Sequence, residues 1–167
     1  MRILPALTLI IAALIAVLPF GADDGMRQAM GFLPVMVAHY WSARRPALVP
    51  VPLIFAVGVG IDILTQKALG FTAVLLLVVA ALAPVEIWLT GRSTAVGRSL
   101  VYAAAMLTAA GCAWAIAGAY MGMMLPGASY LQTALTAMAL YPFMALALIG
   151  IDRLWETPRA QIFVRGG

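Results

Sequence analysis

Charged side chains are scarce in this sequence. Its 167 residues include 6 Asp and Glu and 10 Lys and Arg, whereas hydrophobic residues make up 65%. A soluble domain of this length needs much more charge to cover its surface, so this composition excludes an ordinary soluble domain. We therefore predict an all-α integral membrane protein. No polar stretch is long enough to form a second domain, so residues 1–167 are expected to form one transmembrane domain.

Residues that carry chemistry are also scarce. Cys112 and His39 are the only members of their types. One cysteine cannot form an internal disulfide, and a metal site needs several ligands. There is no GxSxG, HExxH or P-loop motif, and the two acids predicted within spans, Asp62 and Glu86, fall on different helices at opposite faces. We therefore expect no enzymatic activity, no catalytic residue, no cofactor and no metal. For His39 we expect a hydrogen bond to a neighbouring span.

Apolar runs of about 20 residues, the length that crosses a bilayer as a helix, recur along the chain with short polar turns between them. The first run resembles a signal peptide. Phe20 stands at the −3 position of its candidate cleavage site and more spans follow, so we expect an uncleaved span. We predict a bundle of six spans and a polar cytoplasmic tail at residues 152–167. The spans are expected at about residues 3–20, 26–41, 47–64, 69–89, 98–125 and 130–151.

The span at 26–41 is the weakest, and it decides the topology. With six spans and an inner N-terminus, eight of the 10 basic residues lie inside and only Arg27 and Lys67 lie outside. This agrees with the positive-inside rule, whereas five spans divide the basic residues less cleanly. We therefore expect both termini to be cytoplasmic. The basic residues occur in scattered pairs without interleaved aromatic residues, so they indicate topology and no nucleic-acid partner is expected.

Asp62 is the strongest candidate for a functional side chain. A carboxylate within an apolar helix costs about 2.5–3.5 kcal/mol on insertion scales, so the folded protein must compensate for it. One interpretation is an ion-coupled or proton-coupled site, or a polar contact with a partner helix. The structural interpretation is that Asp62, near the outer end of its span, pairs with Lys67 or reaches the first backbone N–H groups of the next helix. The sequence favours the structural interpretation.

Small residues recur at the spacing that lets helices approach closely. Gly118 and Gly122 form a GxxxG pair, and Ala56 and Gly60 have the same spacing in the third span. These rows predict faces that pack within the bundle or against another membrane protein. In a chain this rich in alanine the same spacing also arises by chance. A further row consists of Gly111, Ala115 and Ala119.

One set of residues follows in order along the first half of the chain: Pro34, Tyr40, Trp41, Pro46, Gly58, Gly60, Asp62, Leu69 and Gly70. Their order and spacing resemble the rod shape-determining protein MreD family. The family shows a Pro before a short apolar segment ending in Tyr-Trp, then a turn with Pro, a Gly-rich span ending in Asp-Leu or Asp-Ile, and Leu-Gly. Tyr141-Pro142-Phe143 resembles the family's last span. The short turn at 42–45 and Lys67 before Leu-Gly depart from the pattern.

The resemblance implies a non-enzymatic scaffold in the bacterial inner membrane. MreD-like proteins bind the single-span protein MreC and help couple MreB filaments to peptidoglycan synthesis by RodA and its partner transpeptidase. Their fold resembles the substrate-binding subunits of energy-coupling-factor vitamin transporters. We expect the partner to use a small-residue groove and the region from Asp62 to Gly70, with membrane lipid around the bundle. The alternative is a substrate-binding transporter subunit, which predicts a pocket open to the outside and lined by polar groups and aromatics.

Overall fold

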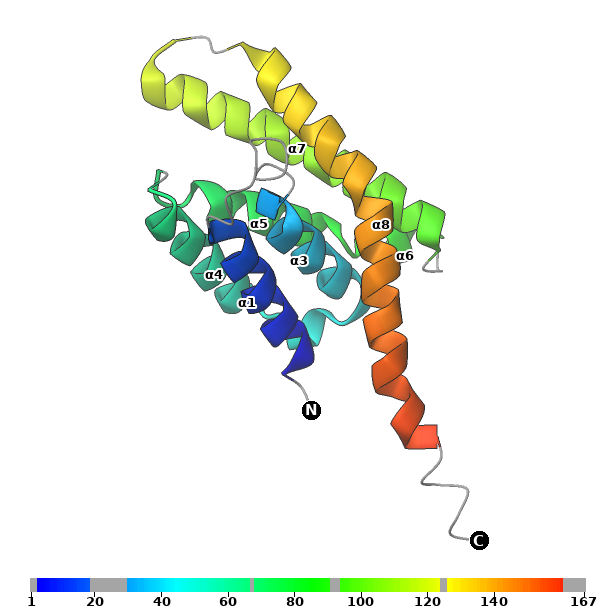
Figure 1. Cartoon of the computed structure of the whole chain (residues 1–167). Coiled ribbons are helices and arrows are strands. Elements are labelled where there is room, and N and C mark those ends of the chain that lie inside the picture. Colours follow the sequence, from blue (N-terminus) through cyan, green and yellow to red (C-terminus); the bar gives the residue numbers. More distant parts are fainter. Residues whose placement is uncertain (1–2, 19–29, 67, 91–93, 124–125, 161–167) are drawn as a thin grey trace, which may run out of the picture.

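A computed structural model describes residues 3–18, 30–66, 68–90, 94–123 and 126–160, and within these ranges the chain is helical with no strand. The all-α prediction is therefore confirmed for this part of the chain. The α-helices, labelled in Figure 1, are α1 (Leu4–Val17), α3 (Leu33–Arg44), α4 (Val51–Leu64), α5 (Phe71–Leu82), α6 (Val85–Thr90), α7 (Ala95–Met121) and α8 (Gly127–Ala160). A short 3-10 helix, η1 (Pro46–Leu48), lies between α3 and α4.

Helix α3 forms the centre of the bundle. Every residue from Pro34 to Ala43 is buried, and α3 contacts α1, α5 and α8. This agrees with the low hydropathy of the segment, because its His, Tyr, Trp and Ser side chains face other helices. The remaining core comes from α1, α4, α5, α7 and α8, including Leu9, Ile54, Leu76, Met106 and Leu148.

Two helical hairpins flank the centre. Helices α4 and α5 pack closely against each other, and α7 and α8 form a longer pair whose tip extends beyond the bundle (Figure 1). The connection from α4 to α5 marks one end of the molecule, which we call the Asp62 end. The opposite end holds the end of α3 and the start of α7, and we call it the Asp152 end after the buried Asp152 of α8.

Two of these helices are long and apolar enough to cross a membrane. The segments Val96–Met121 and Gly127–Asp152 each contain 26 residues, or about 39 Å at 1.5 Å per residue. The apolar helices α1, α4 and α5 contain 14, 14 and 12 residues. These lengths fall short of the roughly 20 residues that a full crossing needs.

Several helices end at places other than the predicted span boundaries. The expected span at 69–89 divides into α5 and α6 around Pro84, because proline lacks the N–H that continues a helix. Helix α7 ends at Met121, and the next residue, Gly122, adopts a φ of 66°. Helix α8 continues through Asp152 to Ala160, into the region predicted as a polar tail. The predicted start of the second span, 26–29, and residues 161–167 lie outside the described residues.

Candidate functional site

Asp62 joins the end of α4 to the start of α5. Its side chain is fully buried, and its Oδ2 accepts a hydrogen bond of 2.9 Å from the Gly70 N–H. The Thr72 N–H donates to both carboxyl oxygens, at 3.0 Å to Oδ1 and 3.1 Å to Oδ2. These N–H groups lie at the start of α5 and have no partner within the helix. Asp62 therefore caps α5 as the structural interpretation predicted, and Lys67 lies outside the described residues.

The backbone between α4 and α5 turns sharply to make this cap. Gly70 adopts a φ of 90°, a left-handed conformation that glycine tolerates without the cost that a Cβ brings. Thr65 ends α4, with its hydroxyl donating to the Ile61 carbonyl at 2.7 Å. Leu69 lies on the surface beside the cap, 73% exposed. Of the predicted partner-contact residues in this region, Leu69 is thus accessible and Asp62 is enclosed.

Gly58 and Gly60 face different surroundings although they lie two residues apart on α4. A Cβ on Gly58 would lie 2.7 Å from the Ala73 nitrogen and 2.9 Å from the Ala73 Cβ, so only glycine lets α4 approach α5 this closely. A Cβ on Gly60 would meet nothing within 4 Å, and Ala56 is exposed. Gly58 is therefore the close contact of α4, and the predicted row of Ala56 and Gly60 lies away from α5.

The residues of α3 connect the centre of the bundle to two other helices. Pro34 occupies the first turn, where its missing N–H removes no helical hydrogen bond. The Trp41 Nε1–H donates to the Thr8 hydroxyl on α1 at 2.9 Å. His39 Nδ1 lies 2.9 Å from the Tyr141 hydroxyl on α8, so the hydrogen bond predicted for His39 is confirmed.

Tyr102 and Tyr141 enclose His39 in a buried aromatic cluster. Their rings stack with centroids 3.9 Å apart, and each meets the imidazole edge-on at 5.1 Å and 5.3 Å. Both tyrosines are buried, but the Tyr102 hydroxyl has no hydrogen-bond partner among the described residues. The two hydroxyl groups thus differ in their expected contribution to stability, because the Tyr141 hydroxyl makes a hydrogen bond and the Tyr102 hydroxyl makes none among the described residues.

This difference predicts unequal effects on stability for two phenylalanine substitutions. Tyr141→Phe removes a buried hydrogen bond and is expected to lower the free energy of unfolding by about 1 kcal/mol. Tyr102→Phe removes an unpaired hydroxyl, so we expect no loss or a gain in stability. Reversible unfolding in mixed micelles, followed by tryptophan fluorescence, measures both. A larger loss for Tyr102→Phe than for Tyr141→Phe contradicts this assignment.

Asp152 is a buried acid that the sequence analysis did not identify, because it was placed at the start of a polar tail. Its oxygens lie 2.9 Å from Arg44 Nη2 and 3.2 Å from Arg45 Nη2, while its side chain is 3% exposed. The arginines are about one-third exposed, so the ion pairs are partly screened. The available sequence signal was an acid directly after an apolar run, facing an Arg-Arg turn predicted on the same side.

Tyr40 lies between this ion-pair group and the start of α7. Its ring centroid is 5.7 Å from the Arg44 guanidinium carbon and 5.8 Å from that of Arg98, distances at which cations interact with an aromatic face. Arg98 is 5% exposed. Tyr40 thus connects α3 to the basic side chains at the Asp152 end.

Within the described part of the chain, Gly118 and Gly122 do not form a packing face between helices. Gly122 caps the C-terminus of α7 with its positive φ, and the nearest atom to a Cβ on Gly118 is the Met123 carbonyl oxygen, at 3.5 Å. The pair therefore shapes the end of the helix. The other predicted row on α7, Gly111, Ala115 and Ala119, is exposed.

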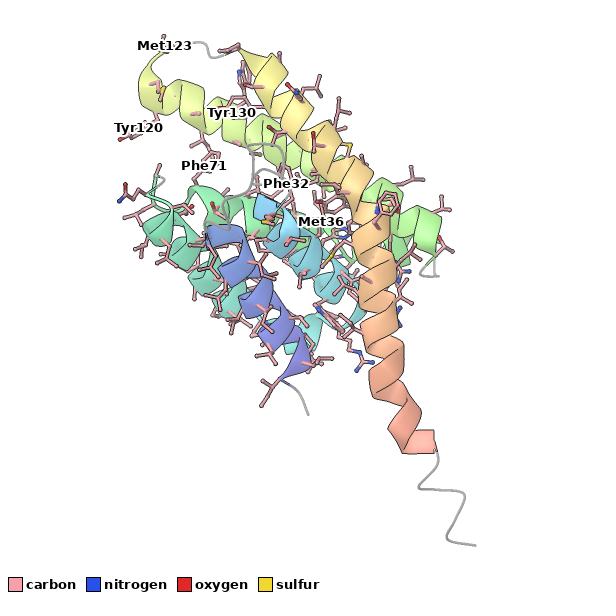
Figure 2. All side chains as sticks on the ribbon, in the orientation of Figure 1. Phe32, Met36, Phe71, Tyr120, Met123 and Tyr130 are labelled. Atoms are coloured by element: carbon pink, nitrogen blue, oxygen red, sulfur yellow. The ribbon has the colours of Figure 1, made fainter. Side chains whose placement is uncertain are left out.

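A cavity of about 330 Å³ lies at the Asp62 end, between the bundle and the α7–α8 hairpin. Phe32, Phe71 and Tyr130 surround it, as labelled in Figure 2. Ser129 and Thr133 contribute hydroxyl groups, and small residues of α7 and α8 contribute much of the remaining wall. We call it the outer cavity, after the side of the membrane that the sequence analysis predicts for this end. Its small wall residues are Ala110, Ala113 and Ala134.

The described residues contain no group of three or more His, Cys, Asp or Glu side chains placed to hold a metal ion. Comparison of the whole sequence and structure with protein-family models, curated proteins and solved structures finds no match.

Proposed function

We propose that this protein is a non-enzymatic scaffold of the bacterial rod complex, placed in the inner membrane, that binds MreC. Through MreC it helps couple MreB filaments to peptidoglycan synthesis by RodA and its partner transpeptidase. The observation that carries the proposal is the Asp62 cap. The Asp and Leu-Gly positions of the MreD-like pattern meet in one hydrogen-bonded turn, which gives the spacing of that pattern a physical reason.

The other positions of the pattern also support a structural role. Gly58 sets the distance between α4 and α5, while Tyr40 and Trp41 are enclosed within the bundle. These side chains therefore build a rigid framework, and a partner meets the surfaces around it. The proposal includes six crossings with both termini cytoplasmic, in which the short helices cross with the help of their flanking turns and local thinning of the bilayer.

We propose the outer cavity as the partner's docking place. Its wall includes Phe71, the residue after Gly70, and the small residues Ala110, Ala113 and Ala134. It thus lies next to the Asp62–Gly70 region that the sequence analysis expected a partner to use, but its small residues are not those of the predicted rows. An apolar helix fits such a wall because small side chains let the backbones approach closely.

A substitution at the cavity rim tests this proposal. Ser129 lines the cavity and is exposed, so Ser129→Trp fills the space with little expected effect on folding. We expect it to reduce capture of co-expressed MreC at least about tenfold, a loss of about 1.4 kcal/mol. Affinity capture of the tagged protein from membranes in mild detergent, with mass spectrometry, measures the effect.

Gln132→Trp is the matched control, because Gln132 is exposed on the same helix and does not line the cavity. It should capture MreC as the unmodified protein does. Equal capture by both variants would exclude the cavity as the docking place. Absence of MreC from the unmodified sample, with transporter ATPases and their coupling subunit in its place, would reject the scaffold proposal itself.

The outer cavity also supports the second candidate function, a substrate-binding transporter subunit. A volume of about 330 Å³, lined by three aromatic residues and by the hydroxyl-bearing Ser129 and Thr133, is within the usual range for a small-molecule site. A transporter subunit that binds a vitamin-like solute there gains stability from it by mass action. A rise in the unfolding temperature of the unmodified protein with such a solute, lost in Ser129→Trp, would favour this function over the scaffold.

A further inference from the structure

A second hollow lies at the Asp152 end, on the other side of the α7–α8 pair. It has a volume of about 370 Å³ and runs between the start of α7 and the middle of α8. We call it the inner groove. Its walls include Arg98, Ser99 and Leu100 of α7 and Pro142, Leu146 and Ile149 of α8. Leu100 and Leu146 are each 66% exposed, so the apolar walls open to the outside of the bundle.

Positive charge gathers at one end of this groove. Arg98 lines it, and the Tyr40 ring that contacts the Arg98 guanidinium also contacts Arg44. Arg44 and Arg45 pair with Asp152 at this end, and Arg98 is the basic side chain that lines the groove itself. The groove is therefore apolar along its length and basic where α7 begins.

The position of Arg98 along α7 indicates which kind of ligand fits the inner groove. It lies in the first turn of the segment Val96–Met121, which is long enough to cross a bilayer, so its guanidinium falls at the level of lipid headgroups when that segment is inserted. The apolar walls then extend along the acyl region. A ligand that matches both parts has an anionic head and a hydrocarbon chain.

We propose that the inner groove binds an anionic phospholipid, with its phosphate at Arg98 and Ser99 and an acyl chain against Leu100, Pro142 and Leu146. The site is separate from the outer cavity. It rests on the membrane location included in the proposed function and is independent of MreC. Bound there, the lipid connects the start of α7 to α8 and holds the Asp152 end at the membrane surface.

Native mass spectrometry of the full chain in detergent tests this site, with phosphatidylglycerol and phosphatidylcholine of the same acyl chains as probes. We expect the protein to retain phosphatidylglycerol about fivefold more than phosphatidylcholine, the ratio that about 1 kcal/mol produces. Arg98→Gln should abolish this preference, and Arg98→Lys should keep most of it. Leu146→Trp, which fills the groove from an exposed position, should reduce retention of both lipids.

Leu135→Trp is the control, since Leu135 is exposed on α8 and lies outside the groove. Equal retention of the two lipids by the unmodified protein would overturn the proposal, as would an unchanged preference in Arg98→Gln. If Arg98→Gln does not fold, Leu146→Trp decides: retention equal to that of Leu135→Trp excludes the groove. Failure of the chain to insert into membranes would instead reject the proposed function.

Discussion

Replacing Asp62 with alanine is expected to lower the free energy of unfolding by about 2–4 kcal/mol. The substitution leaves the N–H groups of Gly70 and Thr72 without their acceptor. The Thr72 hydrogen bond is buried and that of Gly70 partly buried, and each unpaired buried donor costs about 1–3 kcal/mol. Loss of an N-cap alone costs about 0.5–2 kcal/mol. The start of α5 should loosen first, because both donors lie there.

Unfolding in mixed micelles measures this loss, and hydrogen exchange at the start of α5 locates it. Asp62→Asn should fall between the alanine variant and the unmodified protein, since one amide oxygen still accepts a hydrogen bond. Thr65→Ala, in the same turn, is the control. Among the described residues its hydroxyl bonds only within its own helix end, so the expected change is small. A stable Asp62→Ala with a changed ion or proton response would favour the functional interpretation of Asp62.

Replacing Gly58 with alanine is expected to destabilise the protein by about 1–3 kcal/mol, and leucine should cost more. The new Cβ meets the Ala73 backbone, which cannot rotate away as a side chain can. Helices α4 and α5 must then separate, and the packing between them is lost. The separation also moves Asp62 from its acceptor position at the start of α5. Gly58→Ala and Asp62→Ala should therefore be non-additive in a double-mutant cycle.

Gly60→Ala provides a matched control for this prediction. It makes the same chemical change on the same helix, but nothing lies within 4 Å of its new Cβ. Alanine is a better helix former than glycine, so Gly60→Ala should stabilise the protein by up to about 1 kcal/mol. The same unfolding measurement compares the two. Equal effects of both substitutions would contradict the close contact between α4 and α5.

The sequence was most informative where partners lie near one another along the chain. Asp62 is 8 residues from Gly70 and 10 from Thr72, so the carboxylate, the turn and the next helix were recognisable together. The prediction for His39 specified a neighbouring span but could not select Tyr141, 102 residues away. Asp152 and Arg45 are 107 residues apart, and their pairing depends on how α8 crosses the end of α3.

Repeated small-residue spacing was a poor guide to individual glycines. Gly58, Gly60, Gly118 and Gly122 were indistinguishable in an Ala-rich sequence, yet they have different surroundings. Gly58 makes a close helix contact, Gly60 faces open space, and Gly122 ends a helix. Spacing specifies which residues share a helix face, but the position of the neighbouring helix decides whether that face is covered.

Composition and apolar runs by themselves determined that this protein is helical and suited to a membrane. Each apolar segment must bury its surface and satisfy its own backbone hydrogen bonds, whatever the other segments do. The tertiary structure decided which segment lies at the centre. Helix α3 is the least apolar of the predicted spans and the most completely buried, since neighbouring helices supply partners such as Thr8 and Tyr141 that lipid does not. Hydropathy measures preference for lipid over water, and it contains no information on which helix will be enclosed by the others.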